Sequence, residues 1–287
     1  MTHPLVAAAR PRTLPAAIAP VLVGTAAAGS FIAWRMGAAV VVALAIQIGV
    51  NFANDLFDAT GGVDTEARVG PQRAVASGLV SPGAMRAAMI AAFLVAGAAG
   101  VVLAAAVGWE LLLVGVAAFA AAIAYSGGPR PYASRGLGEI SVFLFFGLVA
   151  TIGSAYVQEE AITRLAYVSS IPIGLLATAI LVVNNLRDIE SDAAAGKTTL
   201  AVRIGARRTR LLYEVLVTVA FLATAAVAVT AKSFLPLLAL IAIPFAVTPT
   251  LTVLHSDEPQ KLITALGGTA RLELIYAVLL AVGLWAS

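Results

Sequence analysis

The sequence predicts an all-α integral membrane protein, and three observations support this prediction. The 287 residues are 61% hydrophobic and only 11% charged, whereas a soluble domain carries about 25% charged residues. The mean hydropathy is +0.97. Apolar runs close to the roughly 20 residues needed to cross a bilayer recur along the chain. There is no cysteine, which excludes disulfides and thiol chemistry.

Nine transmembrane helices are expected, in a single integral-membrane domain that covers residues 1–287. The fourth expected span is short. Pro15 and Pro20 in the first span, and Pro244 and Pro249 in the eighth, predict local kinks. The expected spans are 14–33, 37–57, 84–106, 111–126, 138–157, 168–187, 211–231, 235–254 and 267–286.

Lysine and arginine are distributed unevenly between the two ends of these spans. Fifteen of the 18 basic residues fall on the side of the N-terminus, and only Arg35, Arg164 and Lys232 fall on the other. The positive-inside rule therefore places the N-terminus in the cytoplasm, and an odd number of spans places Ser287 outside. The pI near 9.4 then fits loops that face the anionic lipid of the cell (inner) membrane better than a nucleic-acid partner.

A cluster of polar side chains ends the second expected span. Asn51, Asn54, Asp55 and Asp58 lie at positions i, i+3, i+4 and i+7, which form one face of a helix. Ionisable side chains are costly within a membrane span, so they indicate a functional site by default.

A second cluster ends the sixth expected span. Asn184, Asp188 and Asp192 lie at positions i, i+4 and i+8, again on one helix face and on the same side of the membrane as the first cluster. Both clusters share the pattern Asn-x3-Asp. Hard oxygen ligands at this density suit Mg²⁺, which is bound through carboxylates and substrate phosphates. The two clusters are therefore expected to share one site that opens to the cytoplasm.

Three loops on the cytoplasmic side contain glycine and basic residues and could form a polar cap over the site. The loop over residues 59–82 is long for a connection between helices. A diphosphate leaving group would find its cations in these loops. The candidate site residues in the loops and at their edges are Asp64, Arg68, Arg73, Tyr125, Lys197 and Arg203.

With these motifs the chain resembles the UbiA superfamily of intramembrane prenyltransferases, over essentially its whole length. Asn54-Asp55-x2-Asp58 with Asp64, and Asp188-x3-Asp192, are similar to the two Asp-rich motifs of the superfamily. Four further stretches resemble the members that act on 1,4-dihydroxy-2-naphthoate in menaquinone biosynthesis. They are ARPRTLP at 9–15, GVDTEARVGPQRAVASGLVSP at 62–82, YSGGPRPY with LGE at 125–139, and NNLRDIESDAAAGKTTLAVRIG at 184–205.

The resemblance implies a nine-helix bundle and a Mg²⁺-dependent transfer of a long polyprenyl group from polyprenyl diphosphate to 1,4-dihydroxy-2-naphthoate, with loss of carbon dioxide. It implies catalytic, metal-associated roles for Asp55, Asp58, Asp188 and Asp192, with Asp64 as a further metal ligand. The residues that it implies for substrate binding are Asn51, Asn54, Arg68, Arg73, Asn184, Lys197, Arg203 and Tyr125.

Several alternatives stay open at this point. The acceptor could be another aromatic ring such as 4-hydroxybenzoate, and a cation-coupled transporter would also need membrane carboxylates. Asn51 could make an interhelical hydrogen bond, Asp64 could sit in a turn, and Tyr125 could belong to an interfacial belt. Residues that could serve only topology are Arg68, Arg73, Lys197 and Arg203.

Overall fold

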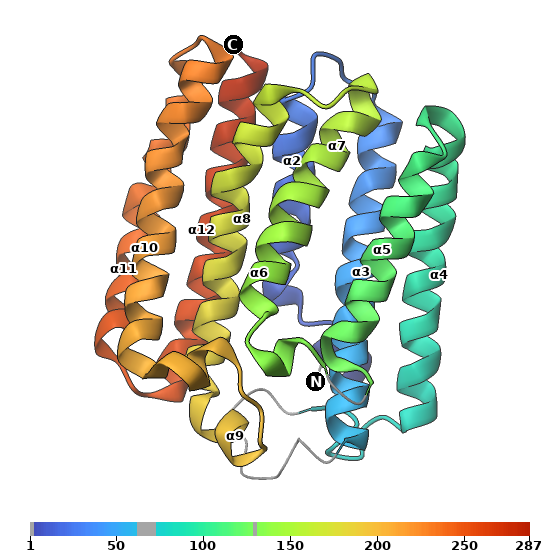
Figure 1. Ribbon diagram of the computed structural model, residues 1–287, viewed down its shortest axis with the longest axis vertical. Coiled ribbons are helices and arrows are strands. Elements are labelled where there is room, and N and C mark those ends of the chain that lie inside the picture. Colours follow the sequence, from blue (N-terminus) through green and yellow to red (C-terminus); the bar gives the residue numbers. More distant parts are fainter. Residues whose placement is uncertain (1–2, 62–72, 129–130) are drawn as a thin grey trace.

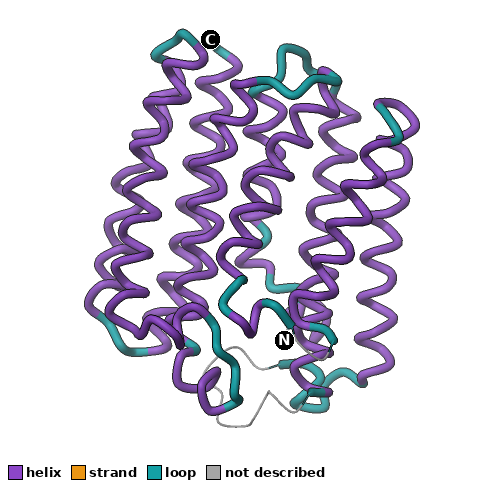
Figure 2. The backbone as a smooth tube through the Cα atoms, in the orientation of Figure 1, coloured by secondary structure: helices purple, strands orange, loops and turns teal. Residues whose placement is uncertain are grey.

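The computed structural model describes residues 3–61, 73–128 and 131–287, and these residues form helices joined by short loops (Figure 1). The predicted site residues Asp64 and Arg68 lie outside the described residues. No strand occurs in the described ranges, which confirms the predicted all-α fold. The helices run roughly side by side, with loops gathered at the two ends of the bundle (Figure 2).

The helical elements follow one another in the order that the apolar runs predict. They are α1 (Pro4–Ala8), η1 (Pro11–Thr13), α2 (Pro15–Ala26), α3 (Ala33–Thr60), α4 (Pro82–Val107), α5 (Glu110–Ser126), η2 (Ala133–Arg135), α6 (Gly138–Val142), η3 (Phe143–Val149), α7 (Ala150–Glu159), α8 (Arg164–Arg187), α9 (Ile189–Ala194), α10 (Leu200–Ala231), η4 (Leu235–Ala242), α11 (Ile243–His255) and α12 (Pro259–Trp285).

Seven helical segments among the described residues are long and apolar enough to cross a membrane. Together with their composition, they indicate an integral membrane protein. The other two expected spans coincide with shorter apolar helices, α2 with 12 residues and α5 with 17 residues. A bilayer core needs about 20 helical residues, so the count of nine membrane crossings stays a prediction.

Two of the expected spans are interrupted helices. The fifth is built from α6, the π-helical segment η3 and α7, which continue one another. The eighth begins as the 3₁₀ segment η4 and becomes α-helical only at Ile243, directly before Pro244. Proline lacks the N–H that continues a helical hydrogen-bond ladder, which accounts for a change of helix type at this point.

Helix α8 lies at the centre of the bundle and is the most deeply buried of the long spans. The largest apolar cluster joins it to α2, α10 and α12, through residues such as Ile173, Leu176 and Tyr276. Gly147 of η3 meets Gly174 of α8 so closely that a Cβ built on Gly147 would lie 2.6 Å from the Gly174 Cα. Small residues at such crossings let helix backbones pack closely where the hydrophobic effect cannot drive association.

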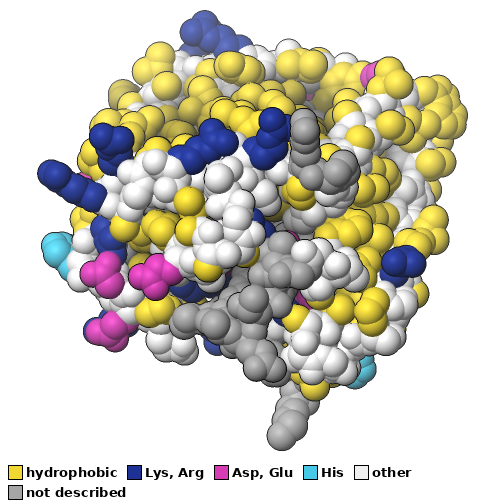
Figure 3. All heavy atoms as spheres, turned by 60° about the horizontal axis from the view of Figure 1, so that its bottom comes forward, with side chains coloured by type: hydrophobic (Ala, Val, Ile, Leu, Met, Phe, Trp, Pro, Cys, Tyr) yellow, Lys and Arg dark blue, Asp and Glu magenta, His cyan; other side chains and the backbone are white. Residues whose placement is uncertain are grey.

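The helix directions bring both Asp-rich segments to one end of the bundle. Helix α3 ends just after Asp58, and α8 ends just before Asp188, where the short helix α9 follows (Figure 1). The C-terminus lies at the other end (Figure 1). Several lysine and arginine side chains lie on the surface at the end that carries the Asp segments, and the surrounding sides of the bundle are largely apolar (Figure 3).

Candidate functional site

A cavity of about 590 Å³ extends from the Asp-rich end into the apolar bundle. Its walls come mainly from α2, α3, α4, α5, η3, α7 and α8, and most of its lining is aliphatic or aromatic. Polar side chains gather at one end of it. The predicted site residues that line the cavity are Asn51, Asn54, Asp58, Arg73, Tyr125, Asn184, Asp188, Asp192 and Lys197.

Helix periodicity explains which face of α3 meets the cavity. Gln47, Asn51, Asn54 and Asp58 all line it, and their spacing of four, three and four residues traces one stripe along the helix. Asp55 lies at the flank of this stripe. The sequence pattern groups all four polar residues of the motif on one face, but only three of them reach the cavity.

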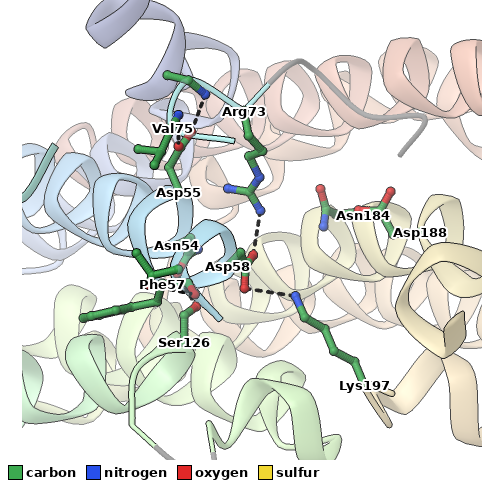
Figure 4. A network of polar contacts seen from close by, with 12 residues as sticks. Asn54, Asp55, Phe57, Asp58, Arg73, Val75, Ser126, Asn184, Asp188 and Lys197 are labelled. Atoms are coloured by element: carbon green, nitrogen blue, oxygen red, sulfur yellow. Dashed lines mark hydrogen bonds and ion pairs between the residues drawn. The ribbon is translucent and has the colours of Figure 1, made fainter. Parts of the chain in front are cut away.

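Asp58 carries the central ion pairs of the site. It is buried, and it meets a cation at each carboxylate oxygen. Arg73 Nη2 lies 2.9 Å from Asp58 Oδ2, and Lys197 Nζ lies 3.1 Å from Asp58 Oδ1 (Figure 4). Arg73 follows α3 in the chain, whereas Lys197 comes from the loop before α10. Asp58 therefore joins two cap segments that are far apart in the sequence.

Asp55 makes a different set of contacts. Its carboxylate accepts the backbone N–H of Ala74 at 3.1 Å and that of Val75 at 2.9 Å (Figure 4). The side chain is buried, and Asp55 is not among the residues that line the cavity. A carboxylate that accepts two N–H bonds fixes the loop that carries Arg73. The predicted metal role of Asp55 stays a prediction that this placement does not support.

The two asparagines of α3 each hold a neighbouring segment. Asn51 Nδ2 donates to the Ala9 carbonyl at 2.9 Å, the kind of hydrogen bond between segments that was an alternative to ligand binding. Asn54 Oδ1 accepts a short hydrogen bond from the Ser126 hydroxyl at the end of α5 (Figure 4). Both side chains also line the cavity, so these bonds leave them in place to meet a ligand.

The second motif lies on the wall opposite Asp58, at the end of α8 (Figure 4). Arg187 donates to both oxygens of Asp188, from Nε at 2.7 Å and from Nη2 at 2.6 Å. The same Nη2 donates to Asn184 Oδ1 at 3.0 Å. Asp192, one turn further on α9, completes the acidic set on this wall.

Arg203 lies outside the cavity lining. It is exposed, and its Nε donates to the Thr198 carbonyl at 3.0 Å. Its side chain also lies against Gly136. This arrangement joins two cap loops and gives no support to the prediction that Arg203 binds a diphosphate.

The donor set matches the chemistry of a Mg²⁺ site in type. Carboxylates and amide oxygens from α3, α8 and α9 face one cavity, and these hard oxygens are the ligands that Mg²⁺ prefers. Within the described part of the chain, no group of three or more His, Cys, Asp or Glu side chains is close enough together to hold a metal ion. The carboxylates are instead divided between two walls, with cations beside Asp58 and Asp188.

The cavity lining extends beyond the predicted site residues. Tyr132 lies edge-on to Tyr125, with ring centroids 5.5 Å apart. Burial raises the pKa of the Tyr132 phenol, which donates to the Ala121 carbonyl at 2.9 Å. Further lining residues with polar groups are Arg10, Thr13, Ser141 and Asn185. The stretches 9–15 and 184–205 were the available signals for Arg10 and Asn185.

Comparisons with known proteins agree with this architecture. The chain is 45% identical over 218 residues to a 1,4-dihydroxy-2-naphthoate octaprenyltransferase of Mycobacterium tuberculosis. The aligned region covers 75% of this chain and 74% of the relative. It is 37% identical to the enzyme of that name from Haemophilus influenzae, over 96% of this chain and 94% of the relative.

Two solved structures have a similar fold. A UbiA homolog from Archaeoglobus fulgidus bound to GPP and Mg²⁺ aligns with a TM-score of 0.64 at 16% identity, over 97% of this chain and 100% of that one. The apo structure of a UbiA homolog from Aeropyrum pernix K1 aligns with a TM-score of 0.68 at 14% identity, over 94% of this chain and 96% of that one. Residues 17–286 match the UbiA prenyltransferase family. This chain belongs to the UbiA prenyltransferase family.

Proposed function

We propose that the protein transfers a long polyprenyl group from polyprenyl diphosphate to 1,4-dihydroxy-2-naphthoate, with loss of carbon dioxide and diphosphate, to give the reduced (quinol) form of demethylmenaquinone. The observation that supports this proposal is a mostly apolar cavity whose polar end carries Asp58 on one wall and Asp188 on the other, in a chain similar to relatives of that activity. An apolar cavity suits the prenyl tail, and the acidic end suits the diphosphate with its metal.

Mg²⁺ is the proposed cofactor. The residues that would hold it are Asp58, Asp188 and Asp192, with Asn54 and Asn184 beside them. Mg²⁺ is commonly bound through one or two carboxylates plus substrate phosphates, so carboxylates divided between two walls suit an ion that arrives with the diphosphate. When bound, the metal would supply positive charge to the leaving diphosphate.

Side chains of the protein would stabilise the leaving diphosphate and keep water from the carbocation. Arg73 and Lys197, which pair with Asp58, lie at the polar end of the cavity and would donate to diphosphate oxygens as the allylic C–O bond breaks. The electron-rich naphthoate ring then attacks the allylic carbocation. The apolar lining around the first isoprene units would keep water from that cation.

The expected topology belongs to the same proposal. One domain over residues 1–287 would lie in the cell (inner) membrane, surrounded by lipid, with the N-terminus and the site on the cytoplasmic side. A reporter fused after Ser287 would then read as extracytoplasmic. A cytoplasmic reading would contradict an odd number of spans.

Product analysis by mass spectrometry tests the activity. Purified protein in nanodiscs receives Mg²⁺, a polyprenyl diphosphate, and either 1,4-dihydroxy-2-naphthoate or 4-hydroxybenzoate. A decarboxylated, prenylated naphthoquinol, which oxidises in air to the naphthoquinone, is the expected product. Product from 4-hydroxybenzoate alone would keep the prenyltransferase site and change the acceptor. No product from either ring, in folded protein, would contradict the proposal and favour a transporter, which liposome uptake assays would then detect.

A further inference from the structure

Glu139 is a buried acid that the proposed chemistry leaves unused. It is the second residue of α6, and its side chain is only 6% exposed. Its Oε1 accepts a hydrogen bond from Asn185 Nδ2 at 2.9 Å, whereas its Oε2 has no hydrogen-bond partner among the described residues. A buried carboxyl group is costly unless its contacts are needed, so the single bond to Asn185 indicates a purpose beyond packing.

The hydrogen bond to Glu139 fixes the orientation of the Asn185 side-chain amide. A carboxylate oxygen accepts hydrogen bonds and does not donate them. The Asn185 amide therefore turns its Nδ2 toward Glu139 and its Oδ1 away from it. Asn185 lines the cavity, and its Oδ1 accepts no hydrogen bond from the described residues. The pair thus offers an oriented hydrogen-bond acceptor to a ligand in the cavity.

The surroundings of Asn185 suit a flat ring. Tyr125 and Tyr132, in their edge-on arrangement, line this cavity together with Phe145 and Phe146 of η3. Gly138, next to Glu139, lies close to the Tyr125 ring, since a Cβ built there would be 3.5 Å from the Tyr125 hydroxyl oxygen, an ordinary contact, and 3.3 Å from a methyl group of Leu181 on α8. Aromatic walls with a few convergent polar groups are typical of a small-molecule site.

Asn184 and Asn185 are consecutive on α8 but face different groups. Asn184 Oδ1 accepts from Arg187, on the side of Asp188, whereas Asn185 faces Glu139 on α6. Successive helical residues are rotated by about 100°, and their Cα atoms are about 3.8 Å apart. The acceptor ring must lie next to the prenyl carbon that carries the diphosphate. Asn185 therefore lies next to the wall that would hold the diphosphate, and its side chain is directed to the side that carries Glu139.

We propose that Asn185 Oδ1 accepts a hydrogen bond from a hydroxyl of the aromatic acceptor, and that Glu139 is the positioning residue that holds Asn185 in this orientation. This assignment rests on the proposed function and adds the residues that select the acceptor. The hydrogen bond turns the ring so that its nucleophilic carbon faces the prenyl group. An acceptor that lacks the hydroxyl leaves the Asn185 oxygen unpaired.

The test separates the two substrates. The Michaelis constants for 1,4-dihydroxy-2-naphthoate and for the polyprenyl diphosphate are measured in wild type, Glu139→Leu, Glu139→Gln and Asn185→Ala, and the Kd of the ring is measured by calorimetry without diphosphate. Loss of one such hydrogen bond should raise the KM and Kd of the ring by about tenfold in Glu139→Leu and Asn185→Ala. The KM of the diphosphate should stay within about twofold. Glu139→Gln keeps an oxygen that accepts from Asn185 and should rescue ring binding.

Asn184→Ala is the matched comparison, because it removes the neighbouring amide on the diphosphate side and should raise the KM of the diphosphate instead. The double variant Glu139→Leu/Asn185→Ala should bind the ring no more weakly than Asn185→Ala, since the two residues act through one bond. Equal changes in both Michaelis constants, or no change in Asn185→Ala, would overturn the assignment. If Glu139→Leu does not fold, Asn185→Ala and Glu139→Gln still decide it. Absence of prenylated naphthoquinone in the wild type would instead refute the proposed function.

Discussion

The two Asp-rich motifs look alike in sequence but are stabilised in different ways. Asp58 is neutralised by Arg73 and by Lys197, which lies 139 residues away in the chain. Asp188 is neutralised by Arg187, its immediate neighbour, which donates to both of its oxygens. The charge of the first motif therefore depends on how the cap loops fold over it, whereas the second motif carries its own cation.

This difference indicates which cations can change partners. Breaking a buried ion pair leaves an uncompensated charge, so Arg73 and Lys197 would leave Asp58 only when another partner for each group arrives. A diphosphate with Mg²⁺ supplies both at once, anionic oxygens for the two cations and a cation for Asp58. Arg187 is fixed beside Asp188 by two hydrogen bonds and by a third to Asn184. It is therefore suited to hold the side chains of Asp188 and Asn184 in position.

The same contrast appears within the first motif. Asp58 faces the cavity, whereas Asp55, three residues earlier, holds the backbone of the loop that carries Arg73. We expect substitution of Asp58 or Asp188 to reduce activity to a similar, large extent, and substitution of Asp55 to reduce it less. The predictions below follow this grouping from the largest expected effect to the smallest.

Removal of divalent metal should abolish activity, because the metal would supply the positive charge that stabilises the leaving diphosphate. Turnover in thoroughly EDTA-treated protein should fall to background and return on addition of Mg²⁺. Full activity in metal-free buffer would mean that Arg73 and Lys197 alone stabilise the leaving group.

Alanine at either cavity carboxylate should have nearly as large an effect. Asp58→Ala and Asp188→Ala each remove a carboxylate that would hold the metal beside the leaving diphosphate, so kcat should fall by roughly 100-fold or more. The intrinsic fluorescence melting curve reports whether each variant is folded. If one of the two folded variants keeps normal kcat, the motifs do not share a site.

Asp55→Asn should have an intermediate effect on activity and a measurable effect on stability. The amide can accept from only one of the two loop N–H groups without bringing its own NH₂ against the other, so the variant should lose about 1–3 kcal/mol of stability. The melting temperature should fall, while kcat for the folded protein stays within about tenfold of wild type. A loss of activity as deep as in Asp58→Ala, with an unchanged melting temperature, would assign Asp55 to the chemistry.

The two long-range cations should affect substrate binding. Arg73→Met and Lys197→Met keep the length of the side chain and remove its charge, and each should raise the KM for the diphosphate by about tenfold. Initial rates over a range of diphosphate concentrations, with the ring saturating, measure this. An unchanged KM would confine both residues to the ion pairs with Asp58.

Arg203→Ala should have the smallest effect. Because Arg203 lies outside the cavity and bonds to the Thr198 carbonyl, kcat and both Michaelis constants should stay within about twofold of wild type. The same assay that measures Lys197→Met checks this. A tenfold rise in the KM for the diphosphate would place Arg203 at the substrate after all.

The sequence predicted the features that depend on local periodicity. Apolar runs located every long helix, and the Asn-x3-Asp spacing brought Asn54, Asp58, Asn184 and Asp188 to one cavity. A helix places residues by angle, however, and the side chain of Asp55 turns toward Ala74 and Val75 because its position is at the edge of the stripe. The spacing alone could not distinguish Asp55 from Asp58.

Features that depend on pairing between distant segments could not be predicted from the sequence. The ion pair of Lys197 with Asp58, and the hydrogen bond of Asn185 with Glu139, join residues 139 and 46 positions apart. Charge pattern alone gave Arg203 the same expected role as Lys197, although only Lys197 lines the cavity. The π-helical segment η3, and the close contact that its Gly147 makes with Gly174, are likewise features that no single-helix pattern reveals.

Metal binding measured without turnover tests the central claim most directly. Mn²⁺ prefers the same oxygen ligands as Mg²⁺, and its electron paramagnetic resonance signal reports the bound fraction in the presence of a non-reactive polyprenyl thiolodiphosphate. If Asp58 and Asp188 form one site across the cavity, Asp58→Asn and Asp188→Asn should each weaken Mn²⁺ binding by at least about tenfold, and Asp55→Asn by less than about threefold. Binding that is lost in Asp55→Asn, or that is unchanged in Asp188→Asn, would contradict the account.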